Sequence, residues 1–234
     1  MHYDFKLKMD RVDTLTNPDF NVAEIDWLLN EAQNIFVKDR FGPNNTKHQG
    51  FEVTQKRIDD LSTLSVKFPE QGPIPLVLEE GVYEAALTAL KYDMMFFLRA
   101  TVEVILPGCT KKVPLKFVQS DDLSECLKDP FNSSSLDYIV YNVGRNSTSA
   151  TPSIYLYPGG YTLGNLYPEY IKTPSRISYG GYTYIDGTQL VQANCELPEQ
   201  THSEIVDLAV LLAAINVENP EYLSLKNMKM SIQE

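Results

Sequence analysis

The sequence predicts an α+β protein, with N-terminal helices and a C-terminal buried helix packed against short antiparallel strands and β-hairpins. Apolar residues recur at helical spacing in residues 21–41 and again near the C-terminus. Between these segments lie short β-branched or aromatic runs interrupted by glycine and proline, which is typical of strands joined by turns. Helices followed by strands and then a helix indicate an α+β architecture. We expect one domain spanning residues 1–234.

The clearest helix is predicted within residues 195–223. Thr201 precedes Glu204 at the spacing of a capping box, in which each side chain binds the backbone N–H of the other residue. Pro220 cannot continue the helix. Two apolar stripes cover most of its circumference, so the helix should be buried. The stripes comprise Ile205, Leu208, Ala209, Leu212 and Ile215, and beside them Val206, Val210, Ala213 and Val217.

Residues 1–20 are predicted to form an N-terminal arm, and a helix is predicted to follow over residues 21–41. In the arm, Phe5, Leu7 and Met9 alternate with polar residues, which favours a short strand or an extended segment. Asn21 and Glu24 supply a capping signal for the helix. Its inward face comprises Val22, Ile25, Leu28, Leu29, Ala32, Ile35 and Phe36, and the only tryptophan, Trp27, is expected to pack.

A further helix is predicted at about residues 52–64. Val53, Ile58, Leu61 and Leu64 have the spacing of an inward face. On the outward face, Lys56 and Asp60 are expected to form a solvated i,i+4 pair, worth a few tenths of a kcal/mol.

Residues 65–120 are predicted to form a β-rich extension. Residues 76–79 have the pattern of a strand, whereas the alanine-rich residues 83–90 favour a helix. The alternating run at 96–106 predicts a strand that pairs, through Pro107-Gly108, with residues 113–119. A short helix is expected to follow in the sequence DDLSECLKD.

Residues 136–190 carry tyrosine-rich strands. Ten of the fourteen tyrosines fall between positions 138 and 184. Gly180-Gly181 separates RISY from YTYI and predicts a two-residue hairpin turn. Tyrosine suits both sheet packing and protein–protein contact, so we expect a mixture of the two roles. The candidate subunit-contact residues are Tyr155, Tyr157, Tyr161, Tyr167, Tyr170, Tyr179, Tyr182 and Tyr184.

The charge and cysteine content exclude several classes of protein. The formal charge of −11 repels polyanions and argues against a protein that grips nucleic-acid phosphates. Three widely spaced cysteines indicate a reduced compartment without a disulfide framework. The N-terminus lacks the apolar core of a signal peptide, and no apolar run is long enough for a membrane anchor.

The sequence contains no recognisable catalytic or metal-binding motif. The three histidines have neither each other nor a cysteine at metal-ligand spacing, so we expect no metal and no cofactor. The glycine-rich residues 158–165 lack the Gly-Lys-Ser/Thr of a phosphate loop and are interpreted as a tight loop between strands. One alternative is a small-molecule hydrolase with its site in this loop, for which Asp186 and Glu169 are the candidate titratable residues. A receptor- or glycan-binding fibre module that uses exposed tyrosines is another.

Four stretches, in their order along the chain, carry a family resemblance. They are YDMMFFLRATVEV, DPFNSSSLDYIVY, YPEYIKTPSRISYGG and CELPEQTHSEIVDLAVLLAAINVENPEYL. Together they resemble the neck and tail ring proteins of crAss-like bacteriophages and, more distantly, the portal–tail adaptor proteins of short-tailed phages. The resemblance extends from about Asn21 to Tyr222 and depends on the order and texture of the segments.

The resemblance implies a structural, non-enzymatic virion protein, made in the host cytoplasm. It implies a closed ring of about twelve copies in the neck or tail, with the portal and neighbouring tail ring proteins as partners. Duplex DNA would pass through the ring without specific binding, and an acidic channel surface would let it slide.

Overall fold

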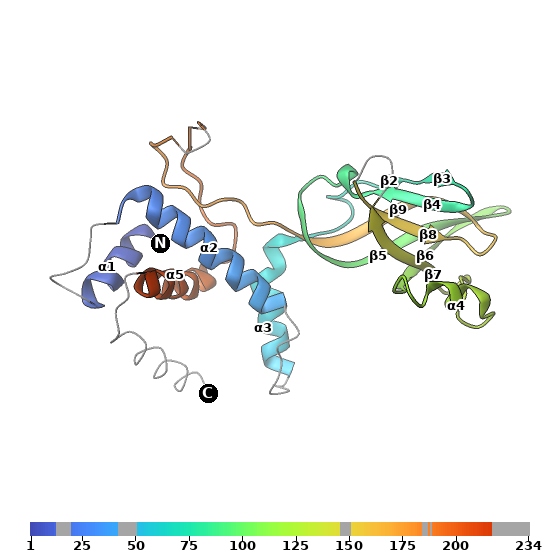
Figure 1. Ribbon diagram of the computed structural model, residues 1–234, viewed down its shortest axis with the longest axis horizontal. Coiled ribbons are helices and arrows are strands. Elements are labelled where there is room, and N and C mark those ends of the chain that lie inside the picture. Colours follow the sequence, from blue (N-terminus) through green and yellow to red (C-terminus); the bar gives the residue numbers. More distant parts are fainter. Residues whose placement is uncertain (13–19, 42–50, 146–150, 184–186, 188, 217–234) are drawn as a thin grey trace. The chain divides into compact units, whose positions relative to one another are not determined.

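The computed structural model describes residues 1–12, 20–41, 51–145, 151–183, 187 and 189–216. Its contacts group the chain into two compact units, one from residues 1–64 and 174–234 and the other from residues 65–173. The first unit is built from helices and the second from strands (Figure 1), so the predicted α+β class is confirmed. The two units are described separately.

The helical unit contains α1 (His2–Val12), α2 (Val22–Phe41), α3 (Phe51–Leu61) and α5 (His202–Asn216). Helices α2 and α5 lie side by side (Figure 1), and α1 packs against α5. Apolar side chains from these helices form the core. Its buried members include Phe5, Ile25, Leu29, Ala32, Phe36, Ile205, Val206, Ala209 and Ala213.

The N-terminal segment is a helix, so the prediction of a short strand at Phe5–Met9 was wrong. Phe5 and Met9 are 1% and 5% exposed. They are four residues apart and share one face of α1, while Leu7 is exposed. An alternation of three residues fits either period, and packing against α5 decides for the helix.

Helix α2 has the predicted bounds and cap, but Trp27 does not pack inside the unit. The N–H of Asn21 donates to the Glu24 carboxylate at 2.8 Å, one half of a capping box. Trp27 is 52% exposed, so its predicted packing role was wrong. Asp26 and Gln33, which were not part of the predicted inward face, are also buried.

Helix α3 is oriented differently from the prediction. Leu61 and Leu64 are buried as expected, but Ile58 is 59% exposed. Asp60 is buried and forms an ion pair with Arg40 of α2, with 3.2 Å between Oδ2 and Nε. The predicted Lys56–Asp60 pair is therefore replaced, and Lys56 binds Glu204 of α5 at 3.0 Å.

The start of α5 is capped differently from the predicted Thr201–Glu204 box. The hydroxyl and the N–H of Thr201 both donate to the carbonyl of Pro198, at 2.8 and 2.9 Å. The Glu204 carboxylate binds Arg40 and Lys56. Two cations on neighbouring helices attract this carboxylate more strongly than one backbone N–H does. Pro220 and Val217 lie outside the described residues.

The strand unit is a mixed, mostly antiparallel sheet. Strand order is β1-β9-β5-β6-β7-β8-β4-β3, and β2 also pairs with β9. Strands β6 and β7 are parallel, and their connection carries helix α4 (Leu123–Lys128), as predicted. The strands are β1 (Ser65–Val66), β2 (Ile74–Pro75), β3 (Val77–Glu79), β4 (Val82–Ala86), β5 (Met94–Leu106), β6 (Cys109–Phe117), β7 (Ile139–Arg145), β8 (Pro152–Tyr157) and β9 (Thr162–Lys172).

The predicted hairpin through Pro107-Gly108 is confirmed, although β6 begins at Cys109 and not at residue 113. Leu106 pairs with Cys109 across Pro107-Gly108. Val102 and Val104 are fully buried, whereas Thr101 and Glu103 lie on the opposite face. The core of the unit joins side chains from most strands, including Ile74, Ala85, Val113, Ile139, Ile154, Leu156, Leu163 and Leu166.

Two local predictions in the middle and late chain were wrong. The pattern of residues 83–90 favoured a helix, but Val82–Ala86 forms strand β4, because it pairs with β3 and β8 and buries Ala85, and only Leu87–Ala89 forms a short 3-10 helix. Among the residues that the structure describes, the two segments flanking Gly180-Gly181 do not pair with each other. Ser178 forms an isolated antiparallel bridge with Ala193, and Thr183 forms one with Gln189. The two glycines therefore lie between the first residues of these two bridges and not at the turn of a hairpin.

Candidate subunit-contact surfaces

The candidate contact tyrosines on β8 are shared between packing and solvent. Tyr155 and Tyr157 are both half-buried. The Tyr155 ring covers Gly144 of β7, where an added Cβ would come within 3.0 Å of ring carbon Cε2. Tyr161, after β8, packs against the core with part of its ring exposed. Burial raises the pKa of the Tyr155 and Tyr157 hydroxyls.

Tyr170 of β9 is fully buried in the strand unit. Its hydroxyl donates to Oε1 of Gln71 at 3.0 Å and accepts the N–H of Tyr92 at 3.3 Å. The same Oε1 accepts the N–H of Lys91 at 2.9 Å. Burial is the main cause that raises the pKa of Tyr170. This tyrosine therefore fastens the Gly72 bend and the start of β5 to β9 from inside the unit.

Tyr167 lies on the outer face of β9 in a cluster with both charge signs. Its hydroxyl donates to Glu103 of β5 at 2.7 Å. The Lys112 ammonium of β6 lies 3.5 Å from the centre of the Tyr167 ring, and the exposed Phe68 ring meets that ring edge-on. The hydrogen bond from Tyr167 is the largest cause that lowers the pKa of Glu103. This ordered face joins three strands and is open to solvent.

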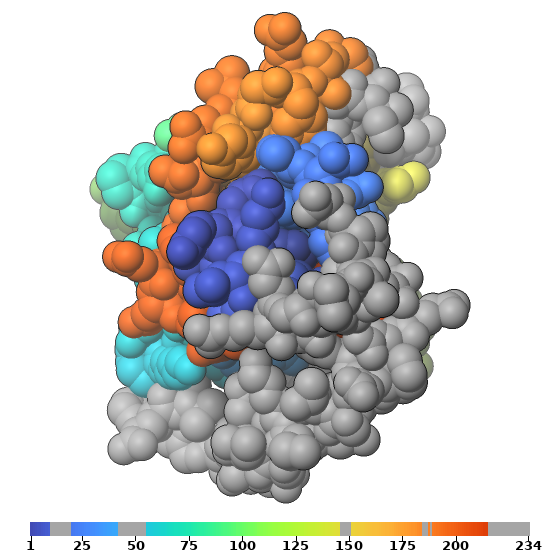
Figure 2. Space-filling model, turned by 90° about the vertical axis from the view of Figure 1, so that its left-hand side faces the viewer, coloured from blue at the N-terminus to red at the C-terminus, as the bar shows by residue number. Residues whose placement is uncertain are grey.

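The late tyrosines meet α1 and α2 at the buried carboxylate of Asp26. Tyr182 donates its hydroxyl to Asp26 at 2.6 Å, and the Tyr179 N–H donates to the same carboxylate at 3.0 Å. His2 of α1 also contacts Asp26, and its ring lies 5.2 Å from that of Tyr179. Figure 2 shows α1, in dark blue, beside the orange residues of this segment. Burial and the contact with Asp26 raise the pKa of Tyr182 to about 12.

A polar face of α2 holds the extended residues 175–179 in place. The Asn30 amide donates to the Ile177 carbonyl at 2.7 Å and accepts the Ile177 N–H at 2.8 Å. Gln33 donates to the Ser175 carbonyl at 3.1 Å. With Asp26, these residues are spaced along one helix face. The apolar pattern did not reveal this ladder, although three polar residues at i, i+4 and i+7 were its visible signal.

Tyr179 is 59% exposed and Tyr182 is partly buried, so Tyr179 is the more accessible of these two candidates. Tyr184 lies outside the described residues. Of the seven candidate tyrosines that the structure describes, five belong to the strand unit and two, Tyr179 and Tyr182, to the helical unit.

Residues 158–161 form the tight connection between β8 and β9, whereas residues 162–165 belong to strand β9, so the predicted loop at 158–165 is confirmed only in its first half. Gly159 has φ +60°, and an added Cβ there would lie 2.9 Å from the Ser134 carbonyl oxygen. Glu169, a candidate for the alternative hydrolase site, forms two hydrogen bonds with Arg99, at 2.8 and 3.1 Å. Asp186, the other candidate, lies outside the described residues.

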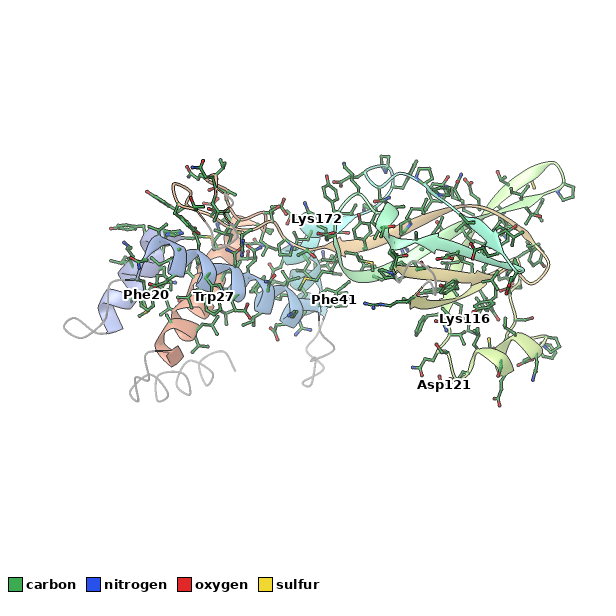
Figure 3. The ribbon with its side chains drawn as sticks, turned by 45° about the horizontal axis from the view of Figure 1, so that its top comes forward. Phe20, Trp27, Phe41, Lys116, Asp121 and Lys172 are labelled. Atoms are coloured by element: carbon green, nitrogen blue, oxygen red, sulfur yellow. The ribbon has the colours of Figure 1, made fainter. Side chains whose placement is uncertain are left out.

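The segment between β6 and β7, residues 120–134, forms an arm whose exposure was not evident from the sequence pattern. Figure 3 shows the arm, with Asp121 labelled, standing clear of the strands. None of the residues of α4 is buried. Phe131 beyond it is 91% exposed, the highest value among the exposed large apolar side chains of the described residues. The Asp129-Pro130 pair, a common start of a turn, was the sequence signal for its sharp bend.

The described residues contain neither a metal-binding cluster nor a membrane-spanning helix. Within them, no group of three or more His, Cys, Asp or Glu residues could hold a metal ion. No helix in that part of the chain has both the length and the apolar character needed to cross a bilayer.

Comparison with known proteins places the chain in a family. A search of curated proteins finds no match. The family model for phage tail ring protein 3/4 matches residues 2–221, which is nearly the whole chain and includes both units. The resemblance to crAss-like phage ring proteins is thereby confirmed. The chain belongs to the phage tail ring protein 3/4 family and is a structural protein of a tailed phage.

Proposed function

We propose that this chain is a ring-forming subunit of the phage neck and tail that connects the portal to the tail and lines the path of DNA exit. The observation that carries the proposal is the family match over residues 2–221. Copies of the chain would close a ring of about twelve subunits, and the portal and the neighbouring tail ring proteins would contact it above and below. The role is non-enzymatic and is performed in the virion, after synthesis in the host cytoplasm.

The charge of the chain supports a passive DNA path. A formal charge of −11 disfavours tight contact with phosphates, so duplex DNA would slide through the channel. A protein that gripped the duplex would need an excess of lysine and arginine at the channel wall. The chain has 20 such residues against 31 aspartates and glutamates.

Imaging of intact particles tests the proposal. We expect averaged images of phage particles to show a ring of this chain in the neck or tail. A labelled antibody against the chain should bind at the position of that ring. Purified chain mixed with its neighbouring ring proteins should form closed rings in negative stain. A chain that stays monomeric beside those neighbours and is absent from the particle would contradict the proposal.

A further inference from the structure

We propose that the arm at residues 120–134 is the element by which one copy of the chain grips the next copy in the ring, and that it seats on a lysine-flanked patch around Tyr92. This inference rests on the proposed function, because it assumes a ring. A closed ring requires head-to-tail contacts, in which two different surfaces of the same chain are complementary. The arm and the Tyr92 patch are two such surfaces of the strand unit.

The arm is firmly anchored at its base. The Ser134 hydroxyl donates to the carbonyl of Tyr157 on β8 and accepts the N–H of Val140 on β7 at 2.9 Å. At the other end, Ser120 accepts the Asn142 amide at 3.0 Å. Both ends of the arm are thus fixed to the sheet, and the residues between them project with a defined direction.

The tip of the arm is also held in one conformation. Asp129 accepts the Phe131 N–H at 2.9 Å, and the Tyr138 hydroxyl donates to the Phe131 carbonyl at 3.0 Å. Cys126 contacts the carbonyl of Asn132 at 3.2 Å. The backbone on both sides of Phe131 is therefore fixed while its ring is 91% exposed. Binding of a pre-ordered aromatic anchor costs little conformational entropy, which is why such residues dominate contact energies.

The chemistry around the tip defines the partner surface. Residues 120–134 carry four carboxylates and one lysine, a formal charge of −3. Leu127 is 38% exposed and extends the apolar part. A complementary surface would present an aromatic or apolar contact flanked by cations.

The Tyr92 patch has these properties. The ammonium groups of Lys91 and Lys172 lie 4.9 and 4.8 Å from the centre of the Tyr92 ring. The patch lies where β5 begins and β9 ends, since Met94 pairs with Lys172. Figure 3 shows Lys172 and Asp121 at well separated places in the strand unit, so one copy can use its arm and its patch at the same time.

The test uses two variants of the full-length chain that disable opposite surfaces. Phe131→Asp disables the arm, and Lys91→Glu with Lys172→Glu disables the patch. Each variant alone should stay monomeric at concentrations where the unaltered chain forms oligomers, as measured by mass photometry. Their mixture retains one good arm and one good patch, so it should form heterodimers that do not grow into rings. Val191→Asp, at a residue 80% exposed in the helical unit, is the control and should assemble normally.

Three outcomes would overturn the inference. Normal assembly by either variant shows that its surface is not the contact, while the proposed ring function stands. Failure of the mixture to form heterodimers shows that the two surfaces do not meet. If the unaltered chain is monomeric at every concentration, the proposed contact between arm and patch does not form. Images of phage particles then test the proposed ring function independently. The variants should fold normally, because the altered side chains lie on the surface. Thermal unfolding curves check that they do.

Discussion

The hydroxyl of Tyr182 donates a hydrogen bond to the carboxylate of Asp26, which lies 156 residues earlier in the chain and is 2% exposed. The carboxylate also binds the Tyr179 N–H and the His2 ring. A single buried anion thereby ties together α1, α2 and the extended segment before α5. Buried charges are tolerated only when several donors satisfy them, and Asp26 meets that condition.

Replacement of Asp26 should destabilise the helical unit strongly. Asp26→Ala removes the shared acceptor and leaves buried donors unpaired, so we expect a loss of about 3 kcal/mol in the free energy of unfolding. Tyr182→Phe removes one hydrogen bond and should cost about 1 kcal/mol. Denaturant unfolding of both variants gives the comparison. Equal costs for the two variants would show that Asp26 is not the centre of the network.

The Tyr182 hydroxyl should make the free energy of unfolding depend on pH at alkaline values. The pKa of Tyr182 is raised from 10.0 to about 12 in the folded protein. Its contribution is therefore complete below pH 10 and is lost as the pH rises towards 12. The difference in unfolding free energy between the unaltered protein and Tyr182→Phe should shrink across this range. A difference that is constant with pH would refute the assignment.

Asn30 should control the order of the extended segment. Asn30→Ala removes two hydrogen bonds to Ile177, whose side chain is buried, and should cost about 1–3 kcal/mol. We expect faster hydrogen exchange at the Ile177 amide, because its acceptor is lost. Glu31→Ala, at the neighbouring exposed position of α2, should leave this exchange rate unchanged. Unchanged exchange in both variants would show that the ladder does not hold the segment.

Arg40 should be important for stability because Asp60 is fully buried beside it. Arg40→Met leaves the Asp60 carboxylate without its nearest cation, and we expect a loss of about 3 kcal/mol. Lys56→Met removes an ion pair whose lysine is 57% exposed, and it should lower the free energy of unfolding by less than about 1 kcal/mol. Unfolding at two salt concentrations measures both effects. A larger loss for the Lys56 variant would argue against this ranking.

Tyr167→Phe should raise the pKa of Glu103 towards its ordinary value of 4.5, since the Tyr167 hydroxyl is the main cause of the lowered pKa. Because the pKa of Glu103 is lower in the folded than in the unfolded protein, its ionised carboxylate stabilises the fold at any pH above the pKa of the unfolded state. This stabilisation is lost as the pH falls through the pKa of the folded state. The variant should therefore lose less stability in acid than the unaltered protein. NMR titration of the Glu103 carboxyl measures the shift, and Lys112→Met is expected to give a smaller one.

Elements with a strong local pattern could be predicted from the sequence. The bounds of α2, the β5–β6 hairpin and the burial of Val102 and Val104 follow from the period of the apolar residues. The strand at Val82–Ala86 could not be predicted in this way. Its alanines favour a helix locally, and the pairing with β3 and β8 overrides that preference.

The exposure of the candidate contact residues could not be predicted from the sequence. Tyrosine content marks both core and surface, so Tyr170 and Tyr179 were indistinguishable in the sequence although one is buried and the other exposed. Nothing in the local sequence around Phe131 indicated that its ring would be exposed on a fixed backbone. Exposure depends on which segments cover a residue, and residues distant in sequence decide that.

The sequence by itself determined the α+β class, the apolar faces of α2 and α5, the alternation of β5 and the family of the protein. Only the tertiary structure decided how the polar groups were satisfied: Asp26 by Tyr182, Asp60 by Arg40, and Thr201 by Pro198 in place of Glu204. Apolar periodicity is a local property because it reflects the geometry of one element. The partner of a buried polar group is set by whichever distant segment packs beside it.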